Sequence, residues 1–90
     1  MTDEEYRELQ GKALAAAALL ESDTWRAAHD AVCAAIFAEW AAASWGAPSI
    51  REQKYAEIKG LHMVRDRLQG WINESRFEHD AREKRRLRAA

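Results

Sequence analysis

The feature that most constrains the fold is a long stripe of apolar residues between Ser49 and Ile72. Its members recur at steps of three and four residues: Tyr55, Ile58, Leu61, Val64, Leu68 and Ile72. This spacing places them on one side of a helix of about seven turns. Because that side has to be covered, the stripe predicts an all-α fold in which other helices pack against this one.

The residues before this stripe predict a partner helix and a turn. Pro48 cannot continue a preceding helix, and Ser49 with Glu52 has the spacing of a capping box. Upstream, a second helical stripe is formed by Trp25, His29, Val32, Ile36, Trp40 and Ala43. A connection as short as Trp45 to Pro48, with Gly46 suited to a C-terminal cap, makes the two helices antiparallel neighbours.

We therefore predict an antiparallel helical hairpin of about residues 24–45 and 49–74. Its buried residues are expected to be Ile36, Trp40, Ile58, Leu61 and Leu68. Gly60 and Gly70 weaken a helix, so each is expected where another backbone or a bulky ring approaches closely.

An N-terminal helix is expected from Thr2 to about Glu21. Thr2 and Glu5 have capping-box spacing, and the acidic first turn suits the positive end of the helix dipole. The apolar stripe is narrow and mostly small, which permits close approach of a second helix: Tyr6, Leu9, Ala13, Ala16 and Leu20. Ser22 to Thr24 is a cluster of N-cap residues, so it should end this helix and start the next.

The last fifteen residues differ in charge from the rest of the chain. Residues 1–75 carry 8 Lys+Arg against 12 Asp+Glu, a net of −4, whereas residues 76–90 carry 6 against 3, a net of +3. Only Phe77 and Leu87 are large and apolar in this segment. We predict one helical domain over residues 1–75 and a basic tail over 76–90 that is helical or disordered.

No pattern of catalytic residues is visible, and we expect no enzyme activity, small-molecule substrate or cofactor. His29 and Cys33 lie four residues apart on one helix face, as two zinc ligands can, but a site needs three or four ligands. His62 would join them only if the register of the hairpin allowed it. We therefore expect no metal, and a single cysteine excludes an internal disulfide.

The basic tail has two interpretations that the sequence leaves open. On a helix Arg82, Arg85 and Arg86 share one side, and with Arg88 they could contact several phosphates of a nucleic acid. Alternatively the tail solubilises the chain or docks on an acidic protein surface. The second interpretation is favoured, since the net charge of the body would repel a nucleic acid.

Two groups of residues resemble small helical proteins encoded in the head and packaging gene clusters of tailed phages and prophages. The first group is Ala16, Leu19, Leu20, Asp23, Trp25 and Trp40. The second is Arg51, Glu52, Tyr55, Ile58, Leu61, Val64, Arg65, Leu68, Trp71 and Ile72. The resemblance covers about residues 13–75 and implies a structural or assembly role without chemistry. The Ala-Pro-Ser hinge and the length of the basic tail depart from that pattern.

The expected function is that of a non-enzymatic, coiled-coil-like assembly or adaptor protein of a phage or prophage. Its expected partners are other copies of itself or a larger phage structural protein, in the host cytoplasm or in the virion. No membrane span is expected. An inhibitor of a host defence protein is a third hypothesis, which no particular residue supports. The expected partner-binding residues are Trp25, Trp45, Trp71, Arg82, Arg85, Arg86 and Arg88.

Overall fold

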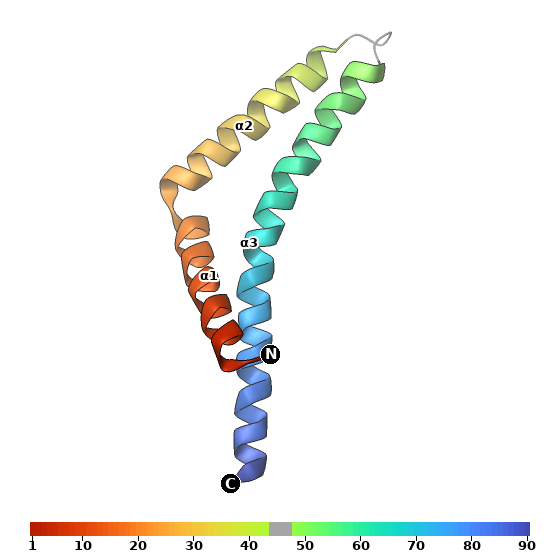
Figure 1. Cartoon of the computed structure of the whole chain (residues 1–90). Helices are drawn as coiled ribbons and strands as arrows, with labels where there is room; N and C mark the ends of the chain where they lie inside the picture. Colours follow the sequence, from red (N-terminus) through yellow and green to blue (C-terminus); the bar gives the residue numbers. More distant parts are fainter. Residues whose placement is uncertain (44–47) are drawn as a thin grey trace. The chain divides into compact units, whose positions relative to one another are not determined.

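The structure, a computed structural model, describes residues 1–43 and 48–90 and is helical almost throughout (Figure 1). Within these residues it has three helices and no strand: α1 (Asp3–Glu21), α2 (Asp23–Ala42) and α3 (Pro48–Ala89). The all-α prediction is confirmed. The turn expected at Trp45 and Gly46 lies outside the described residues. No described helix is long and apolar enough to cross a membrane.

The chain divides into two compact units, and α3 contributes to both. The α1 unit comprises Met1–Leu20 and Arg67–Ala90, and the α2 unit comprises Glu21–Asp66. The α1 unit therefore pairs α1 with the second part of α3, and the α2 unit pairs α2 with the first part of α3.

In the α1 unit, the expected cap and the expected small stripe are both present. The amide of Thr2 donates to Glu5 Oε1, and the amide of Glu5 donates to Thr2 Oγ1, each at 3.1 Å. The pKa of the Glu5 carboxyl is lowered because Thr2 donates hydrogen bonds to its ionised form. The buried residues of the described chain are Leu9, Ala13 and Ala16, all on one face of α1. Two alanines in this stripe allow the backbones to approach closely.

The α2 unit is held by contacts rather than by a buried core. Ser22 is the extended N-cap of α2, and its hydroxyl accepts a hydrogen bond of 3.4 Å from the amide of Trp25. Lys54 Nζ of α3 lies 2.6 Å from Glu39 of α2, and Arg51 donates to the carbonyl of Ala43. None of the described residues in this unit is buried.

The prediction of a buried core between α2 and α3 is therefore wrong, because the expected residues are only partly buried. Ile36, Trp40, Ile58 and Leu61 are half-buried, and Leu68, also half-buried, belongs to the α1 unit. Tyr55 and Val64 of the predicted stripe are exposed. Arg51 and Lys54 are partly buried, and their long side chains contact α2 and its C-cap through the hydrogen bond and the ion pair above.

Two further local expectations are corrected. α3 begins at Pro48, where a missing N–H is tolerated, so Ser49 lies within the first turn and not at the cap. A Cβ added at Gly60 or Gly70 would meet nothing within 4 Å, so among the described residues no backbone of another element and no ring approaches them.

Of the two states expected for the basic tail, helical or disordered, the structure has the helical one. α3 continues past residue 74 to Ala89, and Arg82 of this part contacts Asp3 of α1.

The two leucines at positions 9 and 14 provide a matched test of the α1 unit. Leu9 is 8% exposed and Leu14 is 74% exposed, on the same helix. Leu9→Ala should lower the free energy of unfolding by about 2 to 5 kcal/mol, whereas Leu14→Ala should change it by less than about 0.5 kcal/mol. Urea denaturation followed by circular dichroism measures both, and equal losses would contradict the assignment of the core.

The open surroundings of Gly60 give a prediction of opposite sign. Gly60→Ala should raise the free energy of unfolding by about 0.5 to 1 kcal/mol, because alanine has the higher helix propensity and its methyl group meets no neighbour. The same denaturation experiment tests this. A destabilised variant would show that something approaches Gly60 in solution.

Candidate functional site

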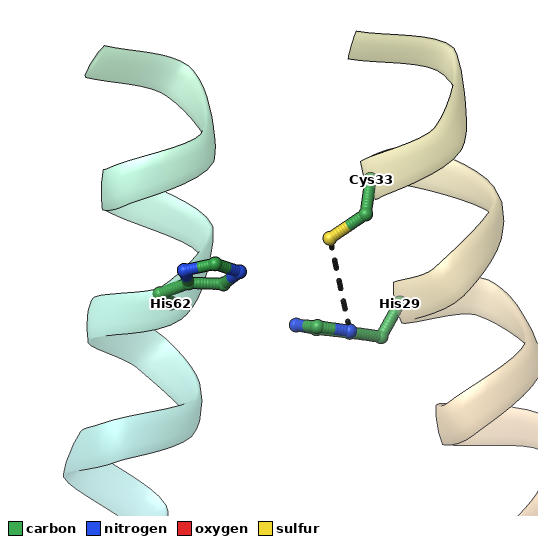
Figure 2. A group of neighbouring side chains, drawn as sticks. All are labelled: His29, Cys33 and His62. Carbon is green, nitrogen blue, oxygen red and sulfur yellow. Dashed lines mark hydrogen bonds between the residues drawn. The ribbon is translucent and has the colours of Figure 1, made fainter. Parts of the chain in front are cut away.

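Three side chains with metal-binding atoms converge between α2 and α3 in the α2 unit (Figure 2). His29 and Cys33 extend from α2, and His62 extends toward them from α3. One potential ligand atom from each of the three lies within 4.8 Å of the others. The sequence analysis paired His29 with Cys33 and left His62 conditional on register, and the structure supplies that register.

His29 is the member of this cluster with an unpaired buried nitrogen. Its side chain is 10% exposed, and its Nε2 atom is buried without a hydrogen-bond partner. Its Nδ1 atom lies 3.9 Å from Cys33 Sγ and 3.6 Å from the exposed carboxylate of Asp30. The ring of Trp25 lies 5.9 Å away, and the ring of His62 stacks at 6.1 Å and 21°. One polar atom of the cluster is thus left without a partner.

A simple signal in the sequence could have placed His62 in this cluster. Both helices rise by the same distance per residue, so residues equally far from the turn lie opposite one another. With the turn expected near residue 46, residue 62 lies opposite residue 30. The observed pairs follow this rule, since Glu39 meets Lys54 and His29 meets His62.

An apolar groove forms a second feature of the α2 unit. It has a volume of about 190 Å³ and is lined by Phe37, Trp40, Tyr55 and Ile58. The Phe37 and Trp40 rings stack with centroids 5.8 Å apart, and the Arg51 guanidinium lies 4.8 Å from the Trp40 ring. Phe37 and Tyr55 are 60% and 66% exposed. Tyr55 was expected within the apolar stripe, so its exposure was not predicted.

Lys54, which precedes the groove residue Tyr55 in the sequence, is paired with carboxylates of the chain. Lys54 contacts Glu39 at 2.6 Å and Glu57 at 3.3 Å. The hydrogen bond to Glu39, followed by that to Glu57, raises the pKa of the Lys54 ammonium group. The stability that this pKa shift contributes is present below the ordinary value of 10.5 and is lost as the pH rises through the raised value.

In the α1 unit, Arg82 joins the last turns of α3 to the start of α1. Its guanidinium contacts Asp3 at 2.6 Å and the carbonyls of Met1 and Thr2, and it stacks 4.4 Å from the Tyr6 ring. The Tyr6 hydroxyl lies 3.3 Å from Nδ1 of His79. The hydrogen bond from Arg82 and its positive charge lower the pKa of the Asp3 carboxyl. The contact is therefore present above the ordinary Asp3 pKa of 3.8 and is lost as the pH falls through the lowered value.

The other arginines expected to bind a partner are placed differently. Arg85 pairs with Glu78 at 3.2 Å and Arg86 pairs with Glu83 at 2.7 Å. Arg88 is exposed in the last turn of α3. The four arginines therefore differ in their contacts. Arg82 connects α3 to α1, Arg85 and Arg86 form ion pairs within α3, and Arg88 is exposed.

The tryptophans expected to bind a partner are also distributed over both units. Trp25 is half-buried beside His29, and Trp45 lies outside the described residues. Trp71 is half-buried in the α1 unit, with Lys12 and Arg67 at 5.6 and 5.5 Å from its ring. Trp25 and Trp71 therefore make intramolecular contacts in separate units.

Comparison with protein-family models, with curated proteins and with solved structures found no match.

The contacts of Arg82 lead to a prediction about the start of α1. Arg82→Ala should speed amide hydrogen exchange in the first two turns of α1, because one side chain is bonded there to Asp3 and to two carbonyls. Arg86→Ala removes an equally basic residue whose guanidinium contacts Glu83 on its own helix, so it should leave this exchange unchanged. Equal exchange in the two variants would contradict the role of Arg82.

Proposed function

We propose that this protein is a non-enzymatic assembly or adaptor protein, of phage or prophage origin, that acts through protein–protein contacts. In this proposal α2 and the first part of α3 form the antiparallel hairpin that makes the contact. The first partner is a second copy of the same chain.

The observation that carries the proposal is the absence of a buried residue among those described in the α2 unit. Instead several large apolar side chains are exposed there: Val32, Phe37, Ile50, Tyr55, Met63 and Val64. Small domains that cannot bury enough apolar surface alone commonly associate. A partner that covers these side chains would supply the missing burial.

The chemistry of the groove favours a second copy as that partner. Its lining residues Phe37, Trp40, Tyr55 and Ile58 are uncharged. In a two-fold symmetric contact the same patch meets itself, so an uncharged patch brings no like charges together. Two hairpins joined in this way would give the packing of a four-helix bundle.

The phage or prophage origin rests on the resemblance of about residues 13–75 to small helical proteins of head and packaging gene clusters. Neighbouring genes that encode a terminase, portal or capsid protein would support this origin. Neighbours of unrelated function would count against it, without affecting the contact through the hairpin.

The alternative of a nucleic-acid-binding tail receives less support. Three of the four arginines that could contact phosphates already contact carboxylates: Arg82 contacts Asp3, Arg85 contacts Glu78, and Arg86 contacts Glu83. Phosphate binding would have to replace these pairs.

Sedimentation equilibrium of the full chain tests the proposal. We expect self-association, and the double variant Phe37→Glu/Tyr55→Glu should weaken it at least tenfold, because charge would then be forced into the contact. Phe77→Glu is the control, since Phe77 is also an exposed aromatic residue but lies in the α1 unit. It should associate like the unmodified chain.

A helical monomer at every concentration would contradict the second copy as partner. Capture of a head or packaging protein by this monomer, lost in the double variant, would then assign the groove to that larger protein. A monomer without either interaction would overturn the proposed function.

A further inference from the structure

We propose that His29, Cys33 and His62 form a binding site for a divalent transition-metal ion of the zinc type. The first support is convergence. The chain has three histidines and one cysteine, and two of those histidines and the cysteine meet within 4.8 Å, from two helices.

The spacing of the ligand atoms fits such an ion after a small adjustment. Zinc binds imidazole nitrogen at about 2.0 to 2.1 Å and thiolate sulfur at about 2.3 Å, so two ligands of a tetrahedral ion lie about 3.3 to 3.6 Å apart. The observed atoms, one from each residue, lie within 4.8 Å of one another. Rotation of the side chains would close the remaining difference, and Figure 2 shows the three side chains directed at one another.

The unpartnered nitrogen of His29 is a second, independent observation. Nε2 is buried and accepts or donates no hydrogen bond, on a side chain that is 10% exposed. Leaving a buried polar atom unsatisfied is unfavourable, and a metal ion would satisfy it. Nδ1 would then turn its proton toward Asp30, whose carboxylate lies 3.6 Å away. A carboxylate behind a metal-binding histidine is the usual arrangement of such sites.

The donor set determines the class of ion. One thiolate and two imidazoles suit zinc and cobalt(II), whereas magnesium and calcium prefer oxygen ligands. Three protein ligands leave a fourth position, as in zinc sites that bind water or a further ligand. The ion would connect α2 to α3 in the unit whose described residues include no buried one, so binding should also stabilise that unit.

Titration of the reduced, chelator-treated full chain with cobalt(II) tests this proposal. We expect one equivalent per chain, with thiolate-to-cobalt charge-transfer absorption and the strong visible bands of tetrahedral cobalt. Zinc should displace the cobalt and raise the melting temperature, and magnesium should do neither. Binding should weaken in acid, because metal ligands have to be deprotonated.

Four variants distinguish this site from adventitious binding. Cys33→Ser is nearly isosteric and should abolish the charge-transfer band while the chain stays helical. His62→Ala should lower the cobalt affinity more than the roughly 10 to 100-fold that loss of an outer-shell partner costs, and Asp30→Asn should lower it within that range. His79→Ala removes the remaining histidine, which lies in the α1 unit, and should leave the cobalt affinity and the cobalt spectrum unchanged.

The proposal is overturned if no cobalt binds, or if the bound cobalt shows no thiolate band. It is equally overturned if Cys33→Ser and His62→Ala bind cobalt as tightly as the unmodified chain. Cys33→Ser barely alters side-chain volume, so this variant should fold. It therefore tests the proposal even if His62→Ala does not fold.

Discussion

The contact of small residues on α1 with α3 is the interaction on which the most firmly packed part of the structure depends. Leu9, Ala13 and Ala16 form the buried face, and alanine there permits close helix packing but supplies little apolar area. Polar contacts add to it at the start of α1, where Arg82 bonds to Asp3 and covers the Tyr6 ring. The basic end of the chain thus takes part in folding the α1 unit.

The α2 unit shows what happens where such a face is missing. Its helices meet through an ion pair, a hydrogen bond and half-buried side chains, while Phe37 and Tyr55 remain exposed. Two additions would each supply stability: a second copy over the groove, and a metal ion held by His29, Cys33 and His62. The two proposals are independent, since the groove and the cluster use different residues.

Local signals predicted the helices well, and the pairing of faces poorly. Caps at Thr2 and Ser22 depend on neighbouring residues, so the sequence suffices to find them. The face that α3 presents depends on its partner, and α3 belongs to two units with different partners. This is why Tyr55 and Val64, which fit the apolar period, are exposed, and why the contacts of Arg82 were not predicted.

The candidate metal site lies between these cases. The spacing of His29 and Cys33 could be recognised in the sequence, but the approach of His62 required the register of α2 against α3. That register follows from the position of the turn, which the sequence did mark. The function could be inferred only as a class, because exposed apolar side chains indicate a partner without naming it.

In this interpretation the α1 unit folds without a partner, whereas the α2 unit needs a partner to cover its exposed apolar side chains. Amide hydrogen exchange of the full chain at low and high protein concentration tests this claim most directly. Protection of residues 1–20 and 67–90 should be independent of concentration, whereas protection of residues 21–66 should be weaker and should rise with concentration as copies associate. Equal, concentration-independent protection of both units would contradict the account.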